Sequence, residues 1–315
     1  MRKVLVRRLL ISIPLLIAVS FFVFTLLNLA AGDPAVKMAG PGATHHQVLA
    51  LRQTLRLDDP FFSRYLRWLG GAVHGDFGTS LSQTQQPVFA EIWHRLGVTL
   101  SLAGVAMAMG LVLGTIGGLV SALRPNGLVD RLVAVASSVA VATPAFLIGL
   151  LLVIPLAIDR TWFPATGYIP LADGVLSWFK ALLLPAAALA ALPAAEIARQ
   201  LRESLVATLD RDYVLAARMK GVRPRMVLLK HTLKNAAIPP VTVLGFRAAQ
   251  LLGGTVVIER LFILDGLGAL SIESVANQDQ TMVLGVVVFF TAIVLLLNVL
   301  VDVSYFYFNP KLRTR

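Results

Sequence analysis

The chain of 315 residues contains no cysteine and few charged residues. The absence of cysteine excludes disulfides and thiolate chemistry. Charged residues make up only 14% of the sequence, whereas soluble domains carry about 25%. Hydrophobic residues make up 57%, and the mean hydropathy is +0.77. A lipid environment explains this composition better than one large soluble core does.

Motifs for nucleotide binding and hydrolysis are also absent. The sequence has no G-x-x-x-x-G-K-[ST], H-E-x-x-H or G-x-S-x-G pattern, which excludes a P-loop for ATP and two common hydrolase sites. His45, His46, His74 and His94 show no metal-ligand spacing, and acidic residues are sparse in the apolar stretches. We therefore expect no catalytic site, cofactor or metal in this chain, and the energy for any transport should come from another subunit.

Six apolar stretches are long enough to cross a bilayer as helices, which takes about 20 residues. They lie near 9–29, 97–122, 133–158, 180–198, 238–258 and 282–308. Pro185 and Pro193 interrupt the fourth, which a membrane helix tolerates where neighbours satisfy the freed backbone groups. The first stretch exceeds the apolar core of a cleaved signal peptide and predicts an uncleaved anchor, with Ala30 and Ala31 as the alternative cleavage site. The sequence thus predicts an all-α integral membrane protein.

Lysine and arginine set the orientation of such a protein, because they are enriched in cytoplasmic loops. They gather in the N-terminus, the loop at 123–132, the insert at 199–237 and the C-terminus. These residues are Arg2, Lys3, Arg7, Arg8, Arg124, Arg131, Arg199, Arg202, Arg211, Arg218, Lys220, Arg223, Arg225, Lys230, Lys234, Lys311, Arg313 and Arg315. The short opposite loops hold only Arg160 and Arg260, with Lys180 at a boundary. We expect both termini in the cytoplasm, and we interpret the net charge of +11 as a topology signal rather than a sign of nucleic-acid binding.

Residues 31–95 form the one sizeable extracytoplasmic segment, between an anchor at 1–30 and a five-helix core at 96–315. Its apolar spacing predicts short amphipathic helices, and Gly75-Asp76-Phe77-Gly78 predicts a tight turn. The segment is interpreted as a cap packed over the bundle or as a docking platform for an external partner, two roles that are compatible, with Asp76, Phe77 and Gly78 as candidate contacts.

Small and charged residues inside the spans suggest where helices meet. Gly110, Gly114 and Gly118 share one helix face and predict close helix packing. Arg247 lies near the middle of a predicted span, so it should face the bundle interior, a subunit interface or a water-filled path, or pair with a carboxylate elsewhere. Glu259 and Arg260 are expected at the outer edge, where they would be solvated.

The most specific feature is the basic insert between the fourth and fifth spans. From Asp212 to Pro240 it reads D-Y-V-L-A-A-R-M-K-G-V-R-P-R-M-V-L-L-K-H-T-L-K-N-A-A-I-P-P. A polar, helix-forming loop of this length between two hydrophobic segments is a place for a soluble partner to act on a membrane domain. The alternative is a solvated basic loop that touches lipid headgroups.

Within the insert, Leu215-Ala216-Ala217-x-x-x-Gly221 resembles the E-A-A-x-x-x-G loop of ABC importer membrane subunits. Leu215 stands where the family has glutamate, and Pro239 follows Gly221 by 18 residues, a spacing that resembles the dipeptide and oligopeptide branch. Other segments agree with that branch in order along nearly the whole chain. They are Asp59-Pro60 with Tyr65 and Trp68, Gly75 to Ser80, Arg95-Leu96 with Thr99-Leu100, Leu113-Gly114 through Asp130-Arg131, Thr143-Pro144, Phe163-Pro164 with Gly167-Tyr168, Gly253-Gly254 through Glu259, and Asn309-Pro310-Lys311.

One outer segment departs from the branch. Asp265-Gly266-Leu267-Gly268 lacks the proline that often precedes Gly-Leu-Gly there.

The resemblance implies a type I ABC importer-like permease fold with six transmembrane helices, a cytoplasmic coupling helix and a helical extracytoplasmic segment, in a bacterial-type cell membrane. It also implies the partners: a second homologous permease subunit, two cytoplasmic ATPase subunits that bind ATP and Mg, and an extracytoplasmic substrate-binding protein.

The residues of the insert fit a coupling role. Tyr213, Ala216, Ala217 and Lys220 recur at the spacing of one helix face, and small alanines let such a face lie close to a partner. Gly221 should end this helix because glycine readily takes left-handed backbone angles. Arg223 then precedes a proline that starts another helical stretch.

Several functions agree with these observations to different degrees. The first is a permease subunit for peptides, and the second is a permease of the same build for nickel or another small solute. A secondary transporter or channel is disfavoured by the scarcity of intramembrane carboxylates. A membrane enzyme is disfavoured by the lack of a catalytic constellation.

Overall fold

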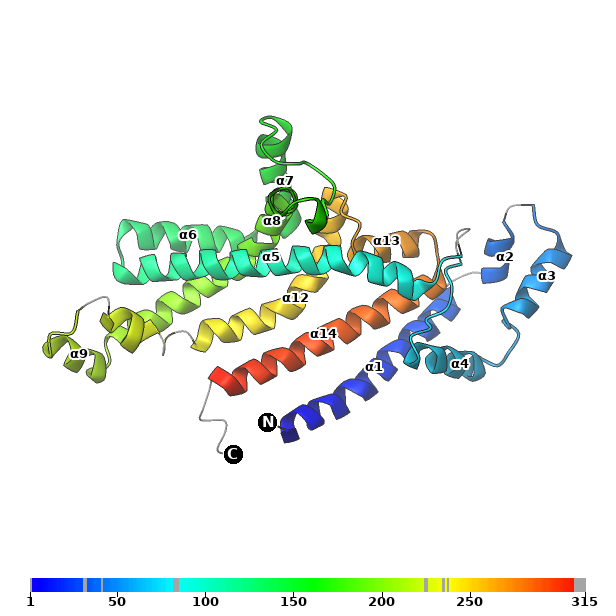
Figure 1. Cartoon of the computed structure of the whole chain (residues 1–315), viewed down its shortest axis with the longest axis horizontal. Coiled ribbons are helices and arrows are strands. Elements are labelled where there is room, and N and C mark those ends of the chain that lie inside the picture. Colours follow the sequence, from blue (N-terminus) through cyan, green and yellow to red (C-terminus); the bar gives the residue numbers. More distant parts are fainter. Residues whose placement is uncertain are drawn as a thin grey trace. The chain divides into compact units, whose positions relative to one another are not determined.

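The computed structural model describes residues 2–30, 33–40, 42–81, 85–223, 226–233, 236 and 238–308. The basic residues Arg225 and Lys234 and the segment Asn309-Pro310-Lys311 lie outside these ranges. Helices make up most of the described residues, and the β pairing among them is one isolated bridge between Thr79 and Pro87. The all-α prediction is confirmed. The chain divides into two compact units. Figure 1 labels the helices.

The first unit covers Thr99–Leu264 and the chain from Leu297 onward. It holds most of α5 (Val88–Leu123), and then α6 (Leu128–Ala142), α7 (Ala145–Val153), η1 (Ile154–Ile158), η2 (Leu171–Asp173), α8 (Val175–Leu209), α9 (Asp212–Met219), η3 (Val227–Leu233) and α12 (Ile238–Phe262). Helices α6, α7 and α12 all pack against α8, which is therefore the central helix of this unit (Figure 1).

Helix α8 runs through Pro185 and Pro193 without a break. Both prolines are buried, together with alanines such as Ala186, Ala190 and Ala195. A buried helix tolerates proline because its neighbours hold it in place, and alanine lets those neighbours approach closely. The prolines therefore do not shorten the span predicted at 180–198, which is part of a 35-residue helix.

The glycine face predicted on α5 is confirmed as a close packing surface. A Cβ atom added to Gly114 would lie 2.7 Å from the backbone oxygen of Ala194, and one added to Gly118 would lie 2.8 Å from that of Ala198. At Gly110 the nearest atom would be the Cβ of Pro193, at 3.3 Å. Only glycine lets α5 lie this close to α8.

The single span predicted at 133–158 is wrong in one respect, since it consists of two helices bent by 110°. The break falls at Thr143, whose φ of −98° and ψ of 125° are extended. A residue before proline is pushed away from helical angles, and Pro144 has no N–H to continue the helix. Helix α7 then begins at Ala145 in a new direction.

The second unit covers Arg2–Val98 and Asp265–Leu296. It contains α1 (Arg2–Ala30), α2 (Pro34–Ala39), α3 (His45–Thr54), α4 (Phe61–Val73), the start of α5, α13 (Leu267–Ala276) and most of α14 (Gln280–Phe308). Two hydrophobic clusters form its core. One is built around Val88, Ile92, Leu267 and Val286, and the other around Phe24, Tyr65, Leu284 and Val288.

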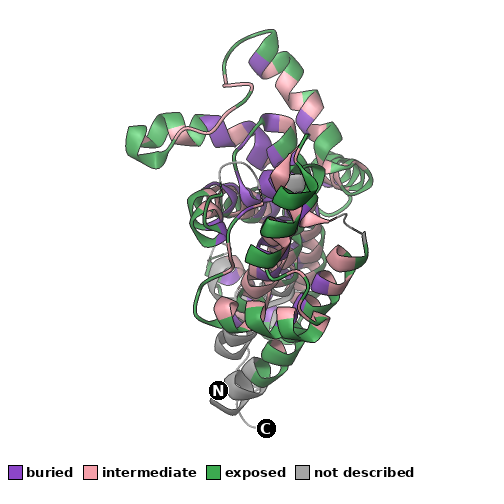
Figure 2. Cartoon of the chain, turned by 90° about the vertical axis from the view of Figure 1, so that its right-hand side faces the viewer, coloured by how far each residue is buried: buried purple, intermediate pink, exposed green. Residues whose placement is uncertain are grey.

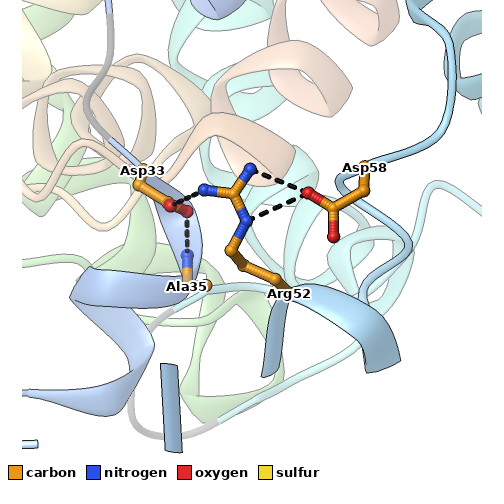
Figure 3. A network of polar contacts seen from close by, with 4 residues as sticks. All are labelled: Asp33, Ala35, Arg52 and Asp58. Carbon is orange, nitrogen blue, oxygen red and sulfur yellow. Dashed lines mark hydrogen bonds and ion pairs between the residues drawn. The ribbon is translucent and has the colours of Figure 1, made fainter. Parts of the chain in front are cut away.

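The short helices predicted in 31–95 are present, and ion pairs join them. Arg52 of α3 contacts Asp33 before α2 and Asp58 before α4, and Asp33 also accepts a hydrogen bond from the backbone N–H of Ala35 (Figure 3). The hydrogen bond to Asp58, followed by the negative charge of Asp33, raises the pKa of Arg52 above its ordinary value. Three charged side chains thus connect the ends of three short helices.

Four described helices are long and apolar enough to cross a membrane. They lie at Leu10–Leu29, Val88–Leu123, Val175–Leu209 and Gln280–Val301, and the bent pair makes up to five. The predicted span at 238–258 lies in α12, which is not among them. By this measure the structure supports four or five spans, rather than the six expected.

Much of the helical surface is exposed, as the green residues in Figure 2 show. On α6 the exposed side chains of Leu128, Leu132, Val135 and Val139 follow helical spacing and form one apolar stripe. Water disfavours an apolar surface of this kind, so lipid or another subunit should cover it.

Candidate functional site

The predicted coupling face lies on α9 and is largely accessible. Tyr213, Ala216 and Lys220 are exposed, and Ala217 is half-buried. Val214, on another side of the helix, is fully buried. Helix α9 is therefore held to its own unit by one face while the predicted coupling face remains available.

Gly221 ends α9 as predicted, with a φ of +74°. The backbone N–H of Val222 donates to the carbonyl oxygen of Ala217 at 3.2 Å, which is the long hydrogen bond of a Schellman C-cap. An added Cβ at Gly221 would meet no atom within 4 Å. The glycine is thus needed for its backbone angles and not for lack of space. Arg223, also exposed, follows directly.

The segment after Gly221 returns to the centre of the unit. The carbonyl oxygen of Arg223 accepts hydrogen bonds from the N–H groups of Met226 and Val227, and η3 then packs against both α8 and α9. Leu228 and Leu233 of η3 pack against a buried cluster of Ala122, Leu201, Leu205 and Ala236. Helix α9 is therefore connected to α8 through packed side chains.

A second polar site at this end of α8 was not predicted. Asp130, in the first turn of α6, is buried and accepts hydrogen bonds from Ser121 of α5, the backbone N–H of Asn126 and the guanidinium of Arg202 on α8. Sequence reasoning counted Arg202 only as a topology residue. The sequence offered no signal for its partner, because the two residues lie 72 positions apart.

Arg247 on α12 pairs with a carboxylate, which is the structural alternative that the sequence left open. Its Nε donates to Glu196 Oε2 at 2.5 Å, and its Nη2 contacts Glu196 Oε1, so the pair is bidentate and joins α12 to α8. Nη1 contacts Gln250, one turn along α12. The two charged side chains are only 19% and 17% exposed. Glu196 was missed, although an acidic residue within a predicted span is itself a signal.

A pocket of about 320 Å³ lies beside this ion pair. Its walls come from the break between α6 and α7, from α8 and from α12. The lining residues are mostly apolar, and the polar side chains among them are Thr143, Arg247 and Gln250. An apolar wall with a few convergent polar groups is typical of a small-molecule site.

The prediction that Glu259 is solvated is wrong. Its side chain is fully buried, and Oε1 accepts a hydrogen bond from Thr99 Oγ1 at 2.7 Å. Sequence position alone placed Glu259 at a helix end, but tertiary packing covers the side of the helix that carries it. Arg260, the next residue, is exposed as expected.

The predicted turn at Gly75–Gly78 is confirmed. Gly75 and Gly78 have φ values of +85° and +88°, and the carboxylate of Asp76 accepts a hydrogen bond from the N–H of Gly78 at 2.9 Å. Asp76 is exposed, whereas Phe77 is half-buried and packs against Trp68 and Phe89. The turn is thus anchored by its aromatic residue and presents its acid to solvent.

No group of acidic or histidine side chains that could hold a metal occurs in the described part of the chain.

Comparisons with known families cover nearly the whole length of the chain. Residues 95–314 match the family of binding-protein-dependent transport system inner membrane components, and residues 1–103 match the N-terminal region of the same kind of membrane component.

Individual relatives are similar over almost their full length. A probable peptide ABC transporter permease protein of Sinorhizobium fredii is 36% identical over 309 residues, which is 98% of each chain. A putative peptide transport system permease protein of Brucella abortus is 36% identical, and the glutathione transport system permease protein GsiC of Escherichia coli is 37% identical, each over 99% of both chains.

Among solved structures, a chain of the MetNI methionine ABC transporter in inward-facing conformations matches with a TM-score of 0.55 at 17% identity. The match covers 70% of this chain and 96% of that one. At this identity the likeness shows the fold alone, which this chain shares with that chain of the MetNI transporter.

Proposed function

Because this chain belongs to the family of binding-protein-dependent transport system inner membrane components, we propose that it forms half of the membrane path of an ATP-driven peptide importer. Membership makes it a multi-pass membrane protein and a transport permease subunit. The observation that carries the peptide assignment is the full-length similarity to relatives named for peptides and glutathione.

The substrate is tested by uptake into vesicles that contain the complete importer. Excess unlabelled di- or oligopeptide should compete with a labelled peptide, and nickel should not. A permease for nickel or another small solute is not favoured by the relatives. Competition by nickel ions, with no effect of peptides, would reverse the assignment.

The other subunits follow from the class of transporter. The proposed complex contains this chain, a second homologous permease subunit, two cytoplasmic ATPases that bind ATP and Mg, and an extracytoplasmic substrate-binding protein. This chain supplies no catalytic site of its own. The distribution of its basic residues supports an orientation with both termini and the insert in the cytoplasm.

Helix α9 is the proposed contact with an ATPase subunit, through Tyr213, Ala216, Ala217, Lys220, Gly221 and Arg223. Its exposed face and its packed connection to α8 support this role. ATP-driven movement of the ATPases would then shift α8 and change access to the central path.

A bulky residue on this face tests the contact. Replacing Ala217 by tryptophan should abolish peptide uptake and peptide-stimulated ATP hydrolysis, while the protein still inserts into the membrane. Ala136→Trp on α6, at an exposed position away from the insert, is the matched control. Normal uptake by Ala217→Trp would refute the docking role.

The turn at Asp76, Phe77 and Gly78 is the proposed contact with the binding protein. Because Asp76 both supports the turn and offers a charge, two variants separate these effects. Asp76→Asn keeps a side-chain oxygen for the N–H of Gly78 and removes the charge, so it should weaken binding-protein affinity if the charge is recognised. An unchanged affinity in Asp76→Asn and in Asp76→Lys would exclude this residue from docking.

Arg247 is proposed to line the translocation path, because it faces the pocket between α6, α7, α8 and α12.

A further inference from the structure

The ion pair of Arg247 and Glu196 is not symmetric with respect to the adjacent pocket. Arg247 and Gln250 are part of the wall of this pocket, and Glu196 is not. Relative to the pocket, Glu196 therefore lies beyond Arg247. Its two carboxylate oxygens both contact the guanidinium, which fixes the plane of that group and offsets the cost of placing a charge inside a membrane protein.

The guanidinium has N–H donors left for a further ligand. Arginine carries five N–H donors in a rigid fork, and Glu196 and Gln250 engage three of them among the described residues. A planar fork of this kind suits a carboxylate better than any other common biological anion except phosphate. The positive side of the ion pair is thus the side available to a molecule in the pocket.

The rest of the pocket is also compatible with an anionic ligand. Apart from Thr143, its other walls are apolar, so an anion that entered without a counter-charge would be strongly disfavoured. Helix α7 begins at Ala145 in the same wall, and the positive end of its dipole adds to the field of Arg247. The volume of about 320 Å³ lies at the small end of the range for ligand sites and suits the end of a peptide.

We propose that Arg247, held by Glu196 and assisted by Gln250, binds the C-terminal carboxylate of a peptide as it passes through the membrane. This inference rests on the proposed function, because it assigns a role within peptide transport. Arg247 is a substrate-binding residue in this scheme, and Glu196 is a positioning residue that acts through it. The pair would therefore select for a free carboxyl end inside the membrane, separately from any selection by the binding protein.

The test compares trialanine with trialanine amide, which lacks the C-terminal charge. Uptake of each is measured in proteoliposomes that contain the complete importer and its binding protein. Because the binding protein is the same throughout, its own preference cancels when each variant is divided by the wild type for the same peptide.

Arg247→Gln should lower uptake of trialanine about tenfold relative to uptake of the amide, which corresponds to one lost charge-assisted hydrogen bond. Arg247→Gln/Glu196→Gln should do the same without leaving an unpaired buried acid. Arg247→Lys keeps the charge and should preserve the preference for the acid. Arg260→Gln, an exposed position on the same helix, is the matched control and should change neither peptide.

Two results would overturn the proposal. One is an equal loss of both peptides in Arg247→Gln and in the double variant, which would make the pair a structural tie. The other is unchanged uptake of trialanine in the double variant. If the wild-type complex imports neither peptide with ATP, the proposed function itself fails, and this outcome is distinct from the first two.

Discussion

The guanidinium of Arg202 donates to both carboxylate oxygens of Asp130, at 2.5 and 2.6 Å, and so joins α8 to the first turn of α6. The same carboxylate binds Ser121 of α5 and the backbone of Asn126. Three helices and the loop at 124–127 therefore meet at one buried acid, in the unit that carries α9.

Removing one partner of this pair should destabilise the protein. In Arg202→Ala the buried Asp130 loses its cation, and we expect a loss of about 3 kcal/mol in the free energy of unfolding. Thermal unfolding of the purified protein in detergent should show this loss of stability as a lower Tm. Arg131→Gln on the same turn of α6, where the side chain is exposed, should leave Tm unchanged. An equal drop in both variants would show that the pair contributes nothing specific.

The glycine face of α5 predicts a position-dependent response to alanine. Gly114→Ala places a Cβ 2.7 Å from a backbone oxygen of α8, so it should destabilise the protein by about 1–3 kcal/mol. Gly104 lies on the same helix, and a Cβ added there would meet no atom within 4 Å. Gly104→Ala should therefore be neutral or slightly stabilising. The two variants are compared by their Tm and by the yield of folded protein. Equal values for both would contradict the close packing at Gly114.

The left-handed backbone at the end of α9 predicts which residues can replace Gly221 at least cost. An alanine at a φ of +74° costs about 1 kcal/mol, because L-residues disfavour this region, whereas asparagine tolerates it better. Peptide-stimulated ATP hydrolysis by the complete importer should therefore fall about fivefold in Gly221→Ala and less in Gly221→Asn. A larger loss in the asparagine variant would mean that side-chain size matters here rather than backbone angle.

The buried Glu259 predicts a requirement for a hydroxyl at position 99. Thr99→Val removes one donor to a fully buried carboxylate and should destabilise the protein by about 1–3 kcal/mol. Thr99→Ser keeps the hydroxyl and should stay close to the wild-type Tm. A valine variant as stable as the serine variant would show that the hydrogen bond adds little.

Local features of the fold were readable from the sequence because they depend on neighbouring residues. Apolar runs predicted helices where α1, α5, α8, α12 and α14 lie. The turn around Asp76 and the end of α9 at Gly221 were predicted from glycine, whose backbone freedom is a local property. The close face of Gly110, Gly114 and Gly118 was predicted from helical spacing alone.

Features that depend on partners distant in the chain were not readable in this way. Thr143-Pro144 accounts locally for a break in the helix, but the size of the bend, 110°, depends on how α7 packs against α8 and α12. Glu259 was expected in solvent because nothing in its neighbourhood indicated that it would be covered.

By itself, then, the sequence determined that this protein is helical, lies in a membrane and presents a glycine-terminated helix in a basic insert. Periodicity, hydropathy and backbone preference act over a few residues, and one chain suffices to read them. Only the tertiary structure decided that Arg247 pairs with Glu196, that Arg202 pairs with Asp130, and that the cation of the first pair faces the pocket. The members of these pairs lie 51 and 72 positions apart, and a charge inside the protein takes whichever opposite charge the packing of helices brings within reach.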